Sequence, residues 1–137
     1  MESLEKMMLF VPNRLSIHEN GMYVSYNIAG IPEDMSVTAM TINVPLPQNT
    51  EGILHVHEIT SAWDDRWIHS VRPTLSPAIN LMHTTSGMQE GRFAVTHFVH
   101  VWRFNSFENH GLYVRLETDD PVSFTERHIP YLLVSTL

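Results

Sequence analysis

The feature that most constrains the fold is an alternation of apolar and polar residues with a period of two, which recurs between turn signals. It is clearest in residues 22–28 and 39–44, which are separated by the turn sequence at residues 30–34. Because successive side chains of a β-strand point to opposite faces, this pattern is typical of strands that bury one face. We predict a strand in each segment and a hairpin-like pairing between the two.

Other segments extend the same pattern to both ends of the chain. Clear strands are predicted at residues 112–117 and 130–137, and shorter ones at residues 9–16, 53–59, 79–84 and 92–95. About eight strands are enough for two packed sheets. The sequence therefore predicts an all-β protein, a two-sheet antiparallel β-sandwich of jelly-roll-like form, with residues 1–137 as a single domain. A chain of this length buries roughly two-thirds of the surface that it exposes when unfolded, which is enough for one core.

One segment departs from the alternation. Val95, Val99 and Trp102 recur at spacings of four and three, which is typical of one face of a helix. We predict a short helix at residues 96–104, with Thr96 placed to cap its first turn. The predicted core collects the apolar side chains of the strands, the helix and one loop: Tyr26, Ile28, Trp63, Val95, Val99, Trp102, Leu112, Val114, Leu132 and Val134.

Composition removes several classes of function. The chain has no cysteine, which excludes disulfides, thiolate nucleophiles and zinc sites built on sulfur. Its formal net charge is -7, from 15 acidic and 8 basic residues, and Lys6 is the single lysine. Because no basic stripe is present to neutralise a phosphate backbone, we expect no nucleic-acid partner.

The sequence also gives no sign of export or of membrane insertion. Residues 1–10 lack the basic start, the apolar run and the small-residue cleavage site of a secretory signal peptide. No stretch approaches the ~20 apolar residues that cross a bilayer. We expect no membrane partner, and we expect intracellular synthesis followed by incorporation into a virion or into a cell-surface or extracellular assembly.

Several segments resemble two related families of β-sandwich domains. Residues 22–32, followed by residues 37–40, resemble the opening of DNRLRE-type domains, in which an Ile-Pro pair stands between two strands. Such domains are found in bacterial cell-surface proteins and are close to a group of carbohydrate-binding modules. Residues 59–65, followed by Arg72 and Pro73, are similar to the Thr-Ser-x-Trp-Asp-Glu loop of the same families.

The second half of the chain continues the resemblance in the same order. Residues 93–102 and 109–112 are similar to those domains and also to the prodomain of TGF-β-type growth factors. In that prodomain a Phe-Asp-Val-Thr segment, a helix and a tryptophan precede Asn-x-Gly-Leu. Residues 130–134 resemble the terminal strand that the families share. The resemblance covers about residues 22–137 and implies the sandwich fold.

The chain departs from the family pattern at three places, one of which is its short N-terminal strand region. Ala94 stands where the families have aspartate, and the second aromatic residue of the Trp-Asp loop is displaced to Trp67 or replaced by His69. The matching motifs are structural, so the resemblance supports the fold better than an activity. What it implies about function is glycan binding or the shielding of a growth factor.

Nine histidines raise the possibility of a metal site. His55 and His57 would share a face of a strand, and His97 and His100 would share a face of a helix. No local pattern supplies the carboxylate that would complete either site, so we favour structural or surface roles and keep His55 and His57 as metal-ligand candidates. We predict no cofactor.

No arrangement of residues indicates catalysis. Asp64 and Asp65 are adjacent, as are Asp119 and Asp120, and neighbours on a loop do not face each other across a scissile bond. There is no Gly-x-Ser-x-Gly segment to hold a nucleophile. We therefore predict that the protein is not an enzyme and has no catalytic residues.

The tryptophans suggest where a sugar would bind. Trp102 is assigned to the core by its helical spacing, and Trp63 is expected to fold onto the edge of the sandwich. Trp67 is the best candidate for an exposed ring on which a sugar could stack. The predicted glycan site is Asp65, Arg66, Trp67 and Arg72.

Three functions are compatible with the sequence. The first is a structural subunit, such as a decoration, collar or appendage protein of a virion or extracellular polymer, whose partners are other protein subunits in a homo- or hetero-oligomer. The second is a carbohydrate-binding module that recognises a polysaccharide. The third is a growth-factor-prodomain-like shielding domain.

Overall fold

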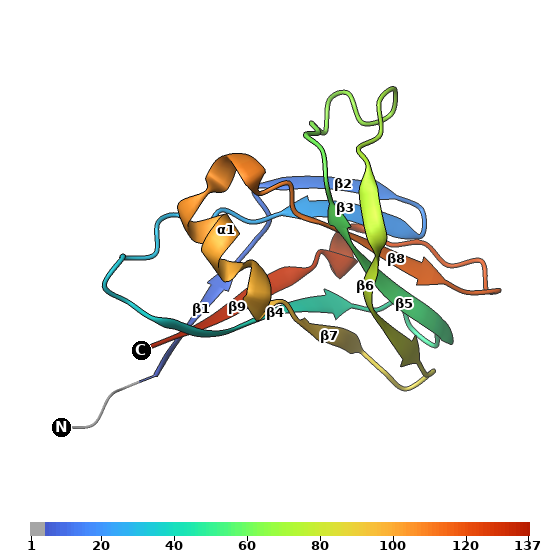
Figure 1. Ribbon diagram of the computed structural model, residues 1–137. Helices are drawn as coiled ribbons and strands as arrows, with labels where there is room; N and C mark the ends of the chain where they lie inside the picture. The colour runs from blue at the N-terminus through green and yellow to red at the C-terminus, as the bar shows by residue number, and fades with distance from the viewer. Residues whose placement is uncertain (1–4) are drawn as a thin grey trace.

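A computed structural model describes residues 5–137 as two antiparallel sheets packed face to face (Figure 1). In chain order the strands are β1 (Lys6–Phe10), β2 (Arg14–His18), β3 (Gly21–Ser25), β4 (Val37–Pro45), β5 (Gly52–Ile59), β6 (Leu75–Thr84), β7 (Glu90–Ala94), β8 (Leu112–Glu117) and β9 (Tyr131–Thr136). The helices are α1 (Val99–Phe104) and the 3₁₀ turns Thr96–Phe98, Ser106–Glu108 and Glu126–His128. The predicted all-β sandwich is confirmed.

Residues 1–4 lie outside the described residues, and the prediction about a signal peptide rests partly on them. Within residues 5–137, no helix is long and apolar enough to cross a membrane.

The two sheets have the strand orders β1-β9-β4-β7 and β2-β3-β8-β5-β6. Their strand pairs are all antiparallel. The predicted hairpin-like pair is wrong, because β3 and β4 lie in different sheets. Tyr26, Ile28 and Ile31 in the connection between them are buried in the core. Burying these three side chains carries the chain across from one sheet to the other, which a simple turn would not do.

The predicted strand at residues 9–16 is also two strands in opposite sheets, β1 and β2. The break falls at residues 11–13, around Pro12. Proline has no N–H to donate to a ladder, so it interrupts the strand at the point where the chain changes sheets. On the far side of the break the Asn13 N–H donates to the Ser25 carbonyl at 2.9 Å, which starts the pairing of β2 with β3.

The core lies between the sheets and contains the inward residues of both. The predicted core side chains that are buried in it are Tyr26, Ile28, Val95, Trp102, Leu112, Val114, Leu132 and Val134. Val99 is only half-buried and packs against this cluster from its edge. Trp63 is buried in a second, smaller cluster with Tyr23, Ile59 and Ile68 on the other side of the five-stranded sheet.

The predicted helix is present as the 3₁₀ turn Thr96–Phe98 continued by α1, which closes one end of the sandwich (Figure 1). The predicted cap is wrong: neither helical segment has a side-chain cap. Instead the Met40 N–H donates to the Thr96 hydroxyl at 3.0 Å. The Val95 N–H donates to the Met40 carbonyl at 2.8 Å, so this corner is fastened to β4. Thr96 therefore anchors the helix to the sheet.

Candidate functional site

The loop between β5 and β6, residues 60–74, is the largest projection from the sandwich (Figure 1). Its base is fixed by the second apolar cluster, in which Trp63 and Ile68 of the loop pack against Tyr23 on the outer face of β3. Tyr113 of β8 is half-buried against the same cluster. The loop is therefore packed onto the outer face of the five-stranded sheet at its base.

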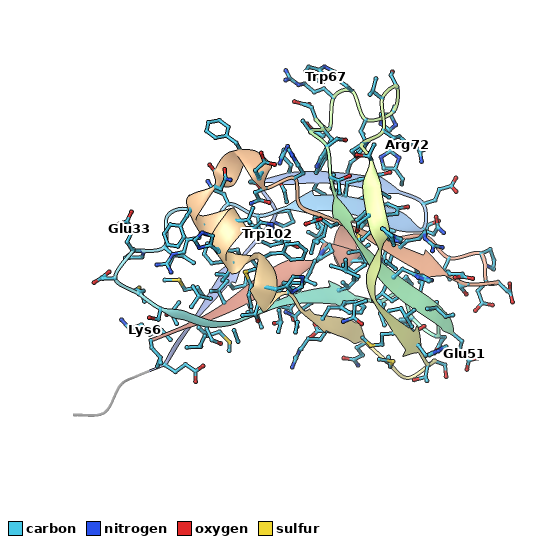
Figure 2. The ribbon with its side chains drawn as sticks, in the orientation of Figure 1. Lys6, Glu33, Glu51, Trp67, Arg72 and Trp102 are labelled. Carbon is cyan, nitrogen blue, oxygen red and sulfur yellow. The ribbon has the colours of Figure 1, made fainter. Side chains whose placement is uncertain are left out.

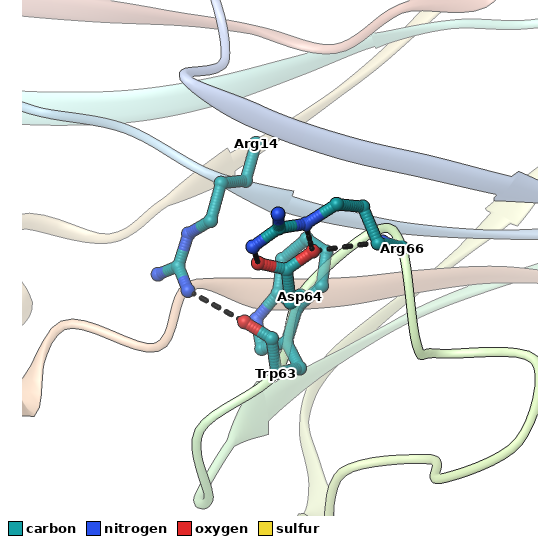
Figure 3. Close-up of polar contacts among 4 residues, drawn as sticks. All are labelled: Arg14, Trp63, Asp64 and Arg66. Atoms are coloured by element: carbon teal, nitrogen blue, oxygen red, sulfur yellow. Dashed lines mark hydrogen bonds and ion pairs between the residues drawn. The ribbon is translucent and has the colours of Figure 1, made fainter.

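Arg14 joins this loop to the body of the protein (Figure 3). Its guanidinium donates to the Trp63 carbonyl at 2.9 Å, to the Asn109 carbonyl at 3.1 Å and to the Ser25 hydroxyl at 2.9 Å. It also lies over the Trp63 ring, 5.0 Å from the ring centroid. Burial lowers the pKa of Arg14, and the carboxylates of Asp64 and Asp65 oppose that shift. Arg14 is a structural crosslink whose hydrogen bonds hold two loops in place.

Beside this crosslink, Asp64 and Arg66 form an ion pair joined by two side-chain hydrogen bonds (Figure 3). Both side-chain hydrogen bonds between the guanidinium and the carboxylate are 3.0 Å long, and the Arg66 backbone N–H donates to the same carboxylate at 2.8 Å. These hydrogen bonds hold the pKa of Asp64 well below its usual range. The Arg66 guanidinium also lies 5.5 Å from the centroid of the Trp67 ring. Asp64 thus fixes the Arg66 side chain next to the indole.

The four predicted glycan-site residues are all exposed on this loop. Trp67 lies at its outer tip with 62% of its surface exposed, whereas Arg72 lies where the chain returns to β6 (Figure 2). Arg66 and Trp67 are brought together, with Asp65 beside them in the chain. Asp64, which the sequence did not predict as a site residue, is the residue that organises the group.

The outer face of the five-stranded sheet carries a row of aromatic rings that the sequence did not predict as a site. Tyr23, Tyr113 and His57 lie opposite one another on β3, β8 and β5. The centroids of the two tyrosine rings are 4.5 Å apart, and those of Tyr113 and His57 are 6.0 Å apart. Gly21 makes room for this arrangement, because a Cβ atom there would lie 2.2 Å from the Tyr113 hydroxyl oxygen.

His55 and His57 do share a strand face, and their ring centroids are 6.3 Å apart. Each has its own partner: His55 Nε2 lies 2.8 Å from a Glu117 carboxylate oxygen, and His57 Nδ1 lies 3.0 Å from the Ser76 carbonyl. In residues 5–137 no three histidine, aspartate or glutamate side chains come together as a metal site would require.

His97 and His100 are exposed and contact aromatic neighbours. The His97 ring packs on Phe98 with centroids 4.2 Å apart, and the His100 ring packs on Phe104 at 5.4 Å. His97 and His100 therefore lie on the solvent side of the helical segment, whose other side faces the core.

Apart from Trp67 and Leu137, the exposed large apolar side chains of the described residues lie at three separate places. The first, the β1 stripe, consists of Met7, Leu9 and Val11, at alternate positions in and just after β1. The second, the β6 stripe, consists of Val71, Leu75, Ile79 and Leu81. The third, the helix-end pair, consists of Phe104 and Phe107, the latter 91% exposed.

Next to the β1 stripe is an apolar groove. It has a volume of about 400 Å³ and is lined by Leu9, Val11, Pro12, Leu15 and residues 129–131. The sequence predicts no site here, because it predicts a single strand at residues 9–16. Leu9 lies on the exposed face of β1 and Val11 just before Pro12, and the hollow lies between β1, β2 and the start of β9.

In sequence comparisons the chain matches no protein-family model and is not significantly similar to any curated protein.

Proposed function

We propose that this protein is a non-catalytic assembly subunit that binds other protein subunits, such as a decoration, collar or appendage protein of a virion or an extracellular polymer. The observation that carries the proposal is the β1 stripe and its groove. Met7, Leu9 and Val11 are each at least 60% exposed. A sandwich strand in contact with water is expected to turn polar side chains outward at such positions. Contiguous exposed apolar surface of this kind marks sites of association with other proteins.

The separation of the three apolar surfaces supports a subunit with more than one neighbour. The β1 stripe belongs to the four-stranded sheet, the β6 stripe to the five-stranded sheet and its loop, and the helix-end pair to the end closed by α1. A subunit in a lattice or a ring contacts several copies through different surfaces.

The polar clusters support the non-catalytic part of the proposal. The Arg14 guanidinium donates its hydrogen bonds to two backbone carbonyls and a serine hydroxyl, and the Asp64 carboxylate accepts from the Arg66 guanidinium. His55 is paired with Glu117, on an open sheet face. Each cluster thus has a structural role within the fold, whereas a general base requires a partner positioned against a substrate.

Sedimentation velocity over a wide range of protein concentration tests this function. We expect the chain to self-associate, because burying apolar surface is favourable at about 25 cal/mol per Å². Replacing Leu9 and Val11 by lysine is expected to weaken association through the β1 stripe. A matched control replaces Glu33 and Asp34 by lysine. Both are exposed on the connection between β3 and β4, and this variant is expected to leave association unchanged. A chain that stays monomeric at all concentrations contradicts the proposal.

Glycan binding is a second candidate, favoured by one observation. Trp67 presents an exposed indole at the tip of the loop, and Asp64 holds Arg66 beside it. An indole with a fixed hydrogen-bond donor next to it suits a sugar ring, which needs both stacking and polar contacts. Because Arg66 lies over the ring, a sugar would stack on the free face or displace the guanidinium.

Retardation in polysaccharide-containing gels tests this second candidate. We expect Trp67→Ala to abolish any retardation, whereas Phe107→Ala, which removes another exposed ring, is expected to leave it unchanged. Equal retardation of the two variants would exclude the loop tip as the binding site. The third function, growth-factor shielding, rests on the resemblance alone and stays a prediction.

A further inference from the structure

The described sheets have four edge strands: β1 and β7 in one sheet, and β2 and β6 in the other. With ten residues β6 is the longest of them. An edge strand presents unpaired backbone N–H and C=O groups along its free side, so it is a template for another strand. Natural proteins usually protect long edges with charged side chains, prolines or bulges.

The four edges differ in charge. Lys6 lies on β1, Arg14 on β2, and Glu90 and Arg92 on β7. The ten residues of β6 include no aspartate, glutamate, lysine or arginine. When two copies of one strand pair antiparallel, the residue on the two-fold axis lies opposite its own copy, and a charged residue there opposes a like charge, which is destabilising. Of these edges, β6 is therefore the one that can pair with its own copy in any register without opposing like charges.

The first half of β6 is protected by a proline and a bulge, whereas the second half has neither, and its last residue, Thr84, is buried. Pro77 lacks an N–H, and Ala78 and Asn80 pair with consecutive residues of β5, which leaves Ile79 as a bulge between them. From Asn80 to Thr84 the register with β5 is regular. On this stretch Leu81 is 51% exposed. Residues 80–84 thus combine a regular backbone edge with an exposed apolar side chain.

We propose that residues 80–84 of β6 pair antiparallel with the same segment of a second copy of this chain, which joins two five-stranded sheets into one. This inference rests on the proposed function, because it names the partner and the contact of the assembly subunit. The pairing has a two-fold axis perpendicular to the sheet, so each side chain stays on its own face and the two Leu81 side chains lie near each other.

The topology favours this arrangement over a head-to-tail chain of sheets. Because all pairs in the order β2-β3-β8-β5-β6 are antiparallel, β2 and β6 run in the same direction. Joining the β6 edge of one copy to the β2 edge of the next by translation would therefore create a parallel pair, which is less stable per residue. It would also place the uncharged edge beside Arg14. Antiparallel pairing of β6 with the β6 strand of a second copy avoids both the parallel pair and the contact with Arg14.

The absence of cysteine makes a direct test possible, since single cysteines can be introduced at each position from 80 to 84. A two-fold axis perpendicular to the sheet passes through one pair of identical residues, whose Cα atoms lie ~4.5 to 5.5 Å apart, within disulfide range. At the neighbouring positions of the strand, each residue lies opposite a different residue of the second copy. The two identical residues there are too far apart to form a disulfide. We expect disulfide-linked dimers from one of the five variants, well above the level from a Glu33→Cys control, whose position is exposed on the connection between β3 and β4.

A second measurement separates the contact from the function. In sedimentation velocity, Leu81→Lys is expected to lose the dimer at concentrations where the unmodified chain is dimeric, with an unchanged circular dichroism spectrum. Glu33→Lys is expected to keep the β6-mediated dimer, because Glu33 is exposed on the connection between β3 and β4. If the chain associates but Leu81→Lys has no effect and no cysteine at 80–84 crosslinks, the β6 contact is excluded and the assembly function stands. A chain that is monomeric throughout overturns both.

Discussion

At the scale of single residues, Arg14 connects parts of the chain that are far apart in sequence. It bonds to carbonyls 49 and 95 residues away, in the loop at Trp63 and in the segment before β8 at Asn109. Replacing it removes the hydrogen-bond partner of the backbone carbonyls of two buried residues. Leaving such groups unsatisfied is a recognised route to large destabilisation.

We predict that Arg14→Met lowers the free energy of unfolding by about 1.5 to 3 kcal/mol, because hydrogen bonds to a charged group are lost while the apolar stem is kept. Urea denaturation measures the change. Arg66→Met is the matched control, since the Arg66 side chain is exposed and its ion pair with Asp64 is screened by water, so that it is expected to contribute little to stability. Equal effects of the two substitutions would mean that Arg14 is not a crosslink.

Gly21 is required by its neighbour across the strand pair. We predict that Gly21→Ala destabilises the protein by about 1 to 3 kcal/mol, because the new methyl group overlaps the Tyr113 ring, which packs against Tyr23. Combining it with Tyr113→Ala is expected to remove most of that extra cost. A double-mutant cycle by chemical denaturation tests the coupling, and additive effects would contradict it.

The environment of His18 predicts a dependence of stability on pH. Its ring faces Tyr23 edge-on and lies 5.0 Å from the His69 ring, and its Nε2 is 2.7 Å from the Ser16 hydroxyl. Burial, followed by the nearby His69 and Arg72, lowers the pKa of His18 below its usual 6.5. The unfolded chain therefore binds a proton more readily than the folded one, so stability is full above about pH 6.5 and falls as the pH drops toward the folded-state pKa.

Thermal denaturation between pH 7.5 and 5 measures this effect. We predict that the melting temperature falls across the range and that His18→Gln makes the fall smaller. His128, whose pKa burial also lowers, contributes with the same sign, so the dependence is reduced and not abolished. A steeper fall in the variant would contradict the assignment.

At the scale of elements, α1 is held by aromatic packing and by its attachment to β4. Trp102 stacks on Phe98 with ring centroids 5.3 Å apart and lies 6.3 Å from the Tyr26 ring. The helix has six residues, too few to be stable alone, so its tertiary contacts must maintain it.

We predict that Trp102→Ala costs about 3 to 5 kcal/mol, since it leaves a large cavity among buried aromatic rings. Phe107→Ala is the control for loss of an aromatic ring near the same helix, and a change within about 0.5 kcal/mol is expected because this ring is exposed. Chemical denaturation followed by circular dichroism provides both values. A small cost for Trp102→Ala would show that the helix can repack.

At the scale of the whole molecule, both sheets share one core, which predicts a single cooperative unfolding transition. Trp102 reports on that core and Trp63 on the second cluster beneath the loop. In a Trp67→Phe variant, which removes the exposed indole, tryptophan fluorescence and far-ultraviolet circular dichroism are expected to give the same denaturation midpoint. An earlier fluorescence transition would show that the loop detaches before the sandwich unfolds.

The candidate sites were predicted only in part. The sequence predicted the exposure of Trp67, but it did not identify Asp64, because the hydrogen bonds between Asp64 and Arg66 depend on a local turn. The row of Tyr23 and Tyr113 gave no sequence signal, since the two residues are ninety positions apart. The sequence did not predict the β1 stripe, because its alternating pattern predicted one strand at residues 9–16 with its apolar face buried.

By itself the sequence determined most of the strand-forming and helical segments and most of the side chains that enter the core, because the period of apolar residues is a local property of each element. Only the tertiary structure decided which strands are neighbours. It placed β3 and β4 in different sheets, split residues 9–16 at Pro12 and left β6 at an edge. These outcomes depend on how the whole set of strands shares one core. An alternating pattern shows that a strand has a buried face, but it does not identify the strand beside it.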